Sequence, residues 1–312
     1  MAENVFHGKN ILLTGVGGFI GSTLAKKLLA MNANLICIDN FSYVERKWIK
    51  DIEKDIELII GDVSERGTFT QIKVEIDYIF HFGAPSSIIL FKKNLEKCYK
   101  ETVLGQLNIF EFAKANNVEK VVYPSSGSIY GGNKKPHKET IYPKPLNIYG
   151  AAKMACEAIA SCYRPFVKST GLRIFAGYGP GEERKHEFAS VIYLFIKDML
   201  EGKRPLIFGD GRQTRDFIYI EDVADCVLRA VKSDVPIINV GTGRPVSFLE
   251  VIEIINNVLD EDIKPQFVKK DKNYVEDLAA DIEIMERELK IKPIPIEAGI
   301  KKFIEYLNKK EV

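Results

Sequence analysis

The chain has 312 residues, 46% of them hydrophobic and 28% charged, which is typical of a soluble globular protein with one large or two closely joined domains. The 44 basic and 43 acidic residues leave a formal net charge of +1, which argues against nucleic acid or a membrane surface as a partner. Five scattered cysteines without Cys-x-x-Cys spacing favour a reducing, cytoplasmic setting, and four isolated histidines argue against a metal site.

The first half of the chain alternates short apolar runs with helical patterns. The predicted strands are residues 11–13, 35–38, 57–60, 78–81, 121–123 and 170–174. The predicted helices cover about residues 20–31, 95–116 and 149–163. Buried apolar strands separated by helices are typical of parallel β-α-β units, so we expect a Rossmann-type, doubly wound parallel sheet of the α/β class. No apolar run is long enough to span a bilayer, and the residues before the first predicted strand show no basic segment followed by an apolar core, so we expect no signal peptide.

The rhythm of strands and helices changes after residue 175. A loop rich in glycine and proline at residues 177–181 comes first, followed by predicted helices and strands at residues 189–201, 205–208, 217–220, 221–231, 237–240, 247–259 and 296–307. We predict a cofactor-binding Rossmann domain at residues 1–175, to which residues 217–242 return. Residues 176–216 and 243–312 are predicted to form a smaller, mixed α/β cap that binds the substrate.

A glycine-rich turn joins the first predicted strand to the first predicted helix. Its pattern is Gly15-x-x-Gly18-x-x-Gly21, and glycines at this spacing let the backbone turn tightly and approach a pyrophosphate closely. The N-terminus of the helix offers free amides and the positive end of its dipole to phosphates. Because the turn lies between a strand and a helix, it predicts a dinucleotide site that includes Phe19 and Ile20.

Asp39 ends the second predicted strand, 18 residues after Gly21. A carboxylate there can accept hydrogen bonds from a ribose diol and repels a 2′-phosphate, and the next residue is Asn40 rather than an arginine. The expected cofactor is therefore NAD rather than NADP, with a loop aspartate that caps a turn as the alternative. Weaker candidates for cofactor contacts follow the third and fourth strands: Asp62, Val63, Phe82 and Ala84.

Tyr149 and Lys153 lie four residues apart on a predicted helix, and therefore on the same face. The positive charge of a lysine favours the phenolate form of a neighbouring tyrosine, which can then move a proton on or off an alcohol. Ser126, at the end of a strand, could hold a substrate oxygen beside it. Tyr-x-x-x-Lys is common by chance, and the alternative is an amphipathic helix whose lysine extends to the surface.

With these motifs, the chain resembles an extended short-chain dehydrogenase/reductase of the NAD-dependent sugar-nucleotide epimerase/dehydratase family, and within it the UDP-glucose 4-epimerase type. The resemblance covers nearly the whole chain. The matching segments are residues 15–21, 39, 62–63, 125–131, 149–153, 172–175, 178–180 and 209–217.

The resemblance implies a catalytic triad of Ser126, Tyr149 and Lys153. Tyr149 would act as general base or acid on a sugar hydroxyl, Lys153 would also bind the nicotinamide ribose, and Ser126 would orient the sugar oxygen. The implied substrate-binding residues are Ser86, Ser126, Ser128, Ala176, Phe208 and Arg215. Arg215 would bind the nucleotide diphosphate, or else form a surface ion pair. Phe208 would pack on the nucleotide base, or else belong to the core.

The residues after Ser126 narrow the chemistry that the resemblance implies. Family dehydratases usually carry an acidic pair where this chain has Gly127 and Ser128, so dehydration is disfavoured. A 4-epimerase is favoured, which oxidises carbon 4 of a nucleotide-diphosphate sugar and returns the hydride to the other face. NAD would stay bound through the cycle.

Several positions depart from the family pattern on the substrate side. Ala176 and Thr102 stand where the family usually has asparagines, and residues 272–276 replace a late segment that usually supplies an arginine. Arg184, Lys185 or Lys272 would replace the lost phosphate contacts, or else belong to solvated surface. A different nucleotide sugar, a C4 dehydrogenase with net oxidation and a non-catalytic NAD-binding regulator all stay open.

The predicted helices at residues 95–116 and 149–163 resemble those that form a four-helix dimer interface in the family. The resemblance therefore implies a homodimer. The alternative is that both helices are buried within the monomer.

Overall fold

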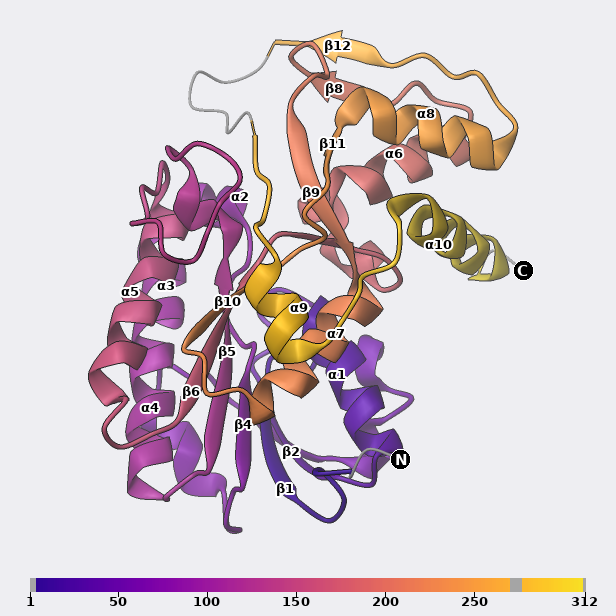
Figure 1. Ribbon diagram of the computed structural model, residues 1–312. Coiled ribbons are helices and arrows are strands. Elements are labelled where there is room, and N and C mark those ends of the chain that lie inside the picture. Colours follow the sequence, from indigo (N-terminus) through magenta and orange to yellow (C-terminus); the bar gives the residue numbers. More distant parts are fainter. Residues whose placement is uncertain (1–3, 270–276, 311–312) are drawn as a thin grey trace.

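A seven-stranded parallel sheet forms the centre of the computed structural model, which describes residues 4–269 and 277–310. Its strands are β1 (Asn10–Thr14), β2 (Asn34–Asp39), β3 (Glu57–Ile60), β4 (Tyr78–His81), β5 (Lys120–Ser126), β6 (Ser169–Ile174) and β10 (Ile237–Val240). The strand order is β10-β6-β5-β4-β1-β2-β3 (Figure 1). Successive strands are added towards one edge of the sheet from β1 to β3 and towards the other edge from β4 onwards, so the strand order reverses between β1 and β4. The predicted doubly wound Rossmann-type sheet is confirmed.

Helices cover both faces of this sheet. One face carries α3 (Leu95–Tyr99), α4 (Gly105–Ala115) and α5 (Ile148–Tyr163), and the other carries α1 (Phe19–Ala30), α7 (Ile220–Arg229) and α9 (Glu283–Leu289) (Figure 1). Because side chains on both faces of the strands pack against helices, β1 and β4 are apolar and buried along most of their length. This explains why continuous apolar runs, rather than alternating ones, predict the strands.

The predicted helix at residues 95–116 is interrupted. Lys100–Leu104 forms a π-helical turn between α3 and α4, and the short helix α2 (Ile88–Lys93) precedes α3. Asn94 caps α3, since its side-chain oxygen accepts a hydrogen bond from the Lys97 amide. The wider turn buries Glu101 and Thr102, and the Thr102 carbonyl oxygen accepts a hydrogen bond from the Cys156 thiol of α5.

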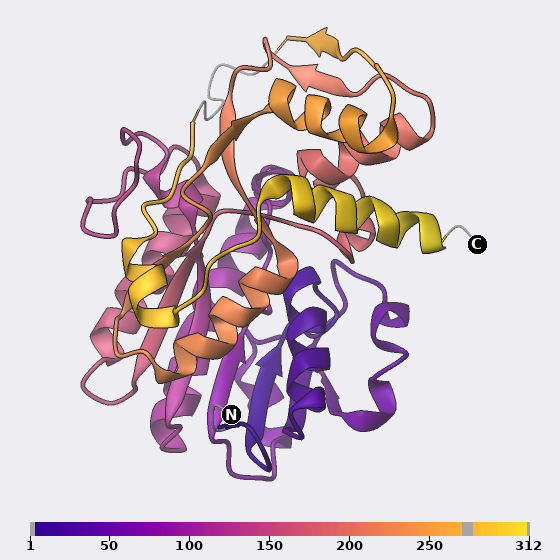
Figure 2. The same cartoon turned by 45° about the vertical axis from the view of Figure 1, so that its right-hand side comes forward.

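The second half of the chain builds a smaller layer above the carboxyl edge of the sheet (Figures 1 and 2). A three-stranded sheet has the order β11-β9-β7, and β8 pairs with β12. These strands are β7 (Ala176–Tyr178), β8 (Leu206–Phe208), β9 (Thr214–Tyr219), β11 (Pro245–Ser247) and β12 (Gln266–Val268). The helices α6 (Val191–Leu200), α8 (Phe248–Leu259) and α10 (Ile296–Lys310) share a core with them.

The boundaries of the two predicted domains stay a prediction. Within residues 217–242, β10 joins the central sheet, whereas β9 pairs with β7 and β11. From the predicted cap, Met285 and Leu289 of α9 pack into the core around β10. In the described part of the chain no helix has the length and apolar character needed to cross a membrane.

Candidate active site

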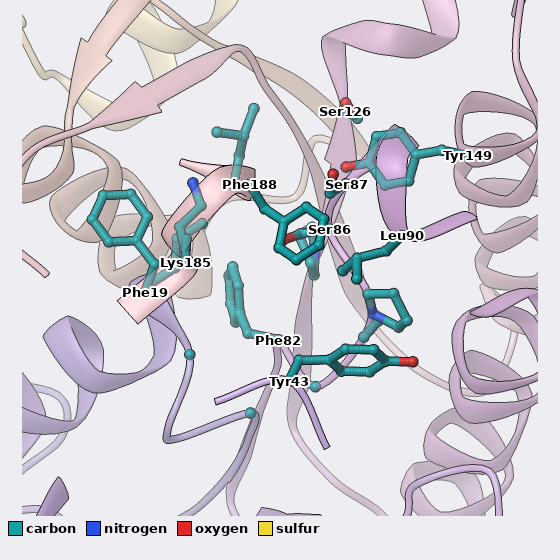
Figure 3. A pocket seen from close by; sticks show the side chains of 18 of the residues that line it. Phe19, Tyr43, Phe82, Ser86, Ser87, Leu90, Ser126, Tyr149, Lys185 and Phe188 are labelled. Carbon is teal, nitrogen blue, oxygen red and sulfur yellow. The ribbon is translucent and has the colours of Figure 1, made fainter. Parts of the chain in front are cut away.

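A cavity of about 770 Å³ opens at the carboxyl ends of the central strands, below the second layer (Figure 3). Ligands of open α/β sheets bind at this edge, where the strand order reverses. The predicted cofactor residues that line the cavity are Gly15, Gly18, Phe19, Ile20, Gly21, Asp39, Asn40, Asp62, Val63, Phe82, Ala84, Tyr149 and Lys153. The predicted substrate residues that line it are Ser86, Ser126, Ser128, Ala176 and Arg215. The structure thus brings together residues that are far apart in the sequence.

The glycine-rich turn has a geometry that larger residues cannot adopt. Gly15 has a φ of +76°, and a Cβ atom there would lie 2.6 Å from the backbone of Phe82. A Cβ atom at Gly21 would lie 2.0 Å from the Gly15 carbonyl oxygen. Helix α1 has no side-chain cap and no acidic residue in its first turn, so its N-terminus suits an anion. The turn therefore fits the pyrophosphate of a dinucleotide.

Asp39 is held at the end of β2 by two backbone amides. Its carboxylate accepts hydrogen bonds from Gly17 N–H at 2.9 Å and Phe41 N–H at 2.8 Å. Burial raises the pKa of the Asp39 carboxyl group, and the amide hydrogen bonds act in the opposite direction. Each carboxylate oxygen keeps further acceptor capacity for a ribose diol. Asn40 follows β2 and Asp62 follows β3. Asn40 Nδ2 donates a hydrogen bond to Asp62 Oδ2 at 3.1 Å, so the two side chains fix each other's position.

Replacing Asp39 with alanine is expected to weaken NAD binding by at least about tenfold, because a charged hydrogen bond contributes about 1.5–3 kcal/mol. The same change should raise the affinity for NADP relative to NAD, since it removes a repulsive carboxylate. Calorimetric titration with both dinucleotides measures the two effects. Asn40→Ala keeps the carboxylate and should keep the preference for NAD. An unchanged preference in Asp39→Ala would contradict the assignment.

Tyr149 and Lys153 are both buried beside the cavity, with 8% and 4% of their surface exposed. The Lys153 ammonium lies 5.9 Å from the centre of the Tyr149 ring. Asn147 caps the N-terminus of helix α5, since its Oδ1 accepts a hydrogen bond from the Gly150 amide at 2.8 Å. This contact fixes the turn that carries Tyr149. Phe91 of α2 packs edge to face against the tyrosine ring. The pair is therefore rigidly placed at the cavity wall.

Ser126 ends β5 and caps the following 3-10 turn, Gly127–Tyr130. Its Oγ accepts a hydrogen bond from Ser128 N–H at 3.1 Å, which leaves the hydroxyl hydrogen to donate to a ligand oxygen. Figure 3 shows the hydroxyl groups of Ser126, Ser87 and Tyr149 facing the same part of the cavity. A serine donor and a tyrosine can thus meet one substrate oxygen.

A buried histidine lies close to Lys153. His81 Nδ1 is 2.8 Å from Thr14 Oγ1, and Thr14 Oγ1 also accepts a hydrogen bond from Gly83 N–H at 2.9 Å. Burial, and then the charge of Lys153, lower the pKa of His81 to about 3. His81 is therefore neutral near pH 7, so it places no second positive charge beside Lys153.

A buried ion pair links the strands and the helix that carry these groups. The Arg173 guanidinium donates two hydrogen bonds to the Glu157 carboxylate, at 2.9 and 2.8 Å. Arg173 Nη1 also donates to the Tyr130 hydroxyl at 2.6 Å, and the Ser125 hydroxyl donates to Glu157. Because Ser125 lies on β5, Arg173 on β6 and Glu157 on α5, the pair fixes these three elements to one another.

Phe208 does not join the other predicted residues. It lies on β8 with 49% of its surface exposed and does not line the cavity. Arg215 does line it, and donates a hydrogen bond to the Thr214 carbonyl oxygen at 2.8 Å. The structure therefore supports a ligand contact for Arg215 more directly than for Phe208.

The candidates for replacing lost phosphate contacts fall in different places. Lys185 lines the cavity, with its ammonium 3.0 Å from Glu182 and 4.9 Å from the centre of the Phe19 ring. Arg184 points instead to the glycine-rich turn. Lys272 and the segment 272–276 lie outside the described residues. Among the described side chains, no group of three or more His, Cys, Asp or Glu could hold a metal ion.

Several cavity residues have no sequence signal of their own. They are Tyr43 and Ser87 from loops, Leu90 from α2, Glu101 from the π-helical turn and Phe188 from the 3-10 segment Glu182–Phe188. Ser87 follows a predicted site residue directly, which is a weak signal. The other four reach the cavity through contacts between distant segments.

Comparisons with known proteins agree with this geometry. A sequence model of the NAD dependent epimerase/dehydratase family matches residues 11–241. A Methanocaldococcus jannaschii protein named putative UDP-glucose 4-epimerase is 32% identical, over 96% of this chain and 98% of its own length. UDP-glucose 4-epimerase of Thermotoga maritima, solved with UDP-glucose, has a TM-score of 0.92 and 28% identity, and the match covers 97% of this chain and 100% of the other. UDP-glucuronic acid 4-epimerase of Bacillus cereus, solved with its substrate and NAD, has a TM-score of 0.86 and 26% identity, covering 96% and 99%.

Proposed function

Because the chain belongs to the NAD-dependent epimerase/dehydratase family, we propose that it inverts carbon 4 of a nucleotide-diphosphate sugar. The observation that carries this proposal is the meeting of Ser126, Tyr149 and Lys153 in the cavity that also holds the glycine-rich turn and Asp39. A proton-transfer group beside a dinucleotide site is the arrangement needed to oxidise an alcohol.

NAD fits the residues at the cofactor end of the cavity, and when bound it supplies a hydride acceptor that can later return the hydride. The open N-terminus of α1 and the glycine-rich turn would hold its pyrophosphate. Asp39 would accept hydrogen bonds from the adenosine ribose, and Lys153 would bind the nicotinamide ribose. The residues of the chain would bind and orient the ligands and move protons.

Tyr149 takes the proton from the hydroxyl group on carbon 4 and gives it back when the carbonyl is reduced again. The Lys153 ammonium lies 5.9 Å from the centre of the Tyr149 ring, so a positive charge stands beside the group that accepts this proton. Ser126 donates a hydrogen bond to the same sugar oxygen and orients it. Inversion requires that the keto sugar rotates in the cavity between the two steps, so that the hydride returns to the opposite face of carbon 4.

Elimination of water is disfavoured at this site. The position after Ser126 is Gly127, where a Cβ atom would lie 3.0 Å from the Phe175 ring. A side chain there would crowd the ring, which would have to shift slightly to make room. Ser128 supplies no acid either, so the acid pair of a dehydratase has no counterpart.

The substrate that we propose is a UDP-sugar, because the solved relatives were determined with UDP-glucose and UDP-glucuronic acid. Arg215 at the cavity wall would bind its diphosphate, since a guanidinium matches phosphate oxygens. Incubation with UDP-, GDP-, dTDP- and CDP-sugars, followed by product NMR and NADH absorbance, tests the proposal. We expect a C4 epimer of a UDP-sugar without net NADH. Net NADH with a released keto sugar would instead establish a C4 dehydrogenase.

A homodimer through α3 and α5 belongs to the same proposal. Leu95, Tyr99 and Ile148 expose about half of their surfaces on this side of the molecule and form a shallow apolar hollow together. A second copy of the chain is the proposed occupant, and sedimentation measures it. A monomer at all concentrations would overturn this part.

The cytoplasmic location stays a prediction that rests on the cysteine pattern, and all five cysteines are free.

A further inference from the structure

Arg184 reaches from the 3-10 segment Glu182–Phe188 to the back of the glycine-rich turn. Its Nη1 donates hydrogen bonds to the carbonyl oxygens of Gly17 and Gly18, at 3.0 and 3.2 Å, and to Ser22 Oγ at 2.6 Å. The side chain is buried, with 7% of its surface exposed. A residue from the second half of the chain therefore holds three acceptors at the start of α1.

These contacts fix the direction in which the turn presents its amides. In a trans peptide the C=O and N–H groups point in opposite directions. When Arg184 binds the Gly18 carbonyl oxygen, the N–H of the same peptide, which belongs to Phe19, points away from Arg184. Phe19 and Gly15 line the cavity, whereas Arg184 does not.

Arg184 also places a positive charge behind the turn. Its buried Nε–H has no hydrogen-bond partner among the described residues, and the carboxylates of Glu183 and Asp51 act on the guanidinium through their charge alone. Burial lowers the pKa of Arg184, yet a guanidinium stays protonated in proteins. A buried cation without a carboxylate in direct contact is unfavourable by itself. A pyrophosphate bound at the turn would offset that cost.

The end of α10 holds Arg184 in place. The Arg184 guanidinium lies 4.9 Å from the centre of the Trp48 ring, and the Lys310 ammonium lies 4.8 Å from the same ring. Lys310 also pairs with Glu183, which accepts a hydrogen bond from the Tyr306 hydroxyl at 2.9 Å. Figure 2 shows α10 running from the second layer towards the segment that follows β2. The last turn of the helix therefore contacts the neighbours of Arg184.

We propose that Arg184 is a positioning residue for the cofactor, which braces the glycine-rich turn and supplies charge for the pyrophosphate, and that Trp48 and the last turn of α10 hold it there. The proposal deepens the proposed NAD site and rests on it. Retention of the cofactor would then depend on the C-terminal helix, which is distant from the turn in the sequence.

The test compares ADP-ribose with adenosine, two ligands that share adenosine but of which only ADP-ribose carries the pyrophosphate, together with a second ribose. Calorimetry should show that Arg184→Gln binds ADP-ribose at least about tenfold more weakly, since a charge-assisted interaction is lost, while its affinity for adenosine stays within about twofold. Arg184→Lys keeps the charge and should recover part of the loss. Equal weakening for both ligands would show a general collapse of the pocket and would overturn the proposal, as would unchanged binding of ADP-ribose.

Lys310→Ala tests the role of α10 without touching the turn. We expect a smaller loss of ADP-ribose affinity, about threefold, because the salt bridge and the contact with Trp48 are partly exposed. Lys309→Ala, one residue away on the same helix, is the matched control and should bind both ligands as the parent chain does.

If Arg184→Gln does not fold, Ser22→Ala and Lys310→Ala decide, and normal ADP-ribose binding by both overturns the proposal. Failure of the epimerase activity would leave these affinities unchanged, so the two hypotheses are separable.

Discussion

Replacement of Tyr149 by phenylalanine is expected to lower kcat for epimerisation by about 10²–10⁴-fold, the usual contribution of a positioned general acid or base. The change removes one oxygen and keeps the ring that packs against Phe91. The fold and the affinity for NAD should therefore stay close to those of the parent chain. Turnover is measured by NMR on the best UDP-sugar of the panel, and NAD binding by calorimetry.

Tyr142→Phe is the matched control for this experiment. Tyr142 has 74% of its surface exposed and does not line the cavity, so its replacement should leave kcat unchanged. If Tyr149→Phe kept full turnover, Tyr149 would not be the proton-transfer group. If neither variant nor the parent chain turned over any sugar while NAD still bound, the non-catalytic NAD-binding regulator would be the better explanation.

The sequence predicts the central sheet well because the physical cause is local. Strands covered by helices on both faces need continuous apolar runs such as residues 11–13 and 78–81, and these are visible without any tertiary information. The second layer is harder. Its strands β7, β11 and β12 have three residues each, which is too short for a period to show. The π-helical turn within the predicted helix at residues 95–116 has no local signal either.

The candidate site follows the same division. The glycine-rich turn, Asp39 and the Tyr149–Lys153 pair are patterns within one or two elements, and the structure brings them to one cavity. The family, the NAD cofactor and the 4-epimerase class agree with the comparisons. The roles of the individual residues stay predictions. The sequence offers Arg184 as a candidate for a phosphate contact or as solvated surface, but not as a partner of the glycine-rich turn, because its acceptors lie more than a hundred residues earlier in the chain.

The Arg173–Glu157 pair is of this hidden kind, and its loss should have the largest effect on stability. Arg173→Met is expected to lower the free energy of unfolding by about 3–5 kcal/mol, because it leaves the Glu157 carboxylate buried without its cation. Both side chains are almost fully buried, so solvent screens the pair little. Urea denaturation of the protein, followed by circular dichroism, measures the change.

The double variant Arg173→Met/Glu157→Met separates the lost pair from the stranded charge. It should be more stable than Arg173→Met alone, since no unpaired charge is left in the interior. Arg244→Met provides the surface control: Arg244 pairs with Glu250 and Glu297, all three side chains are roughly half exposed, and the expected cost is about 0–1 kcal/mol. A double variant that loses the sum of both single changes would show that the two side chains contribute independently. The ion pair would then not be what fixes β5, β6 and α5 around the site.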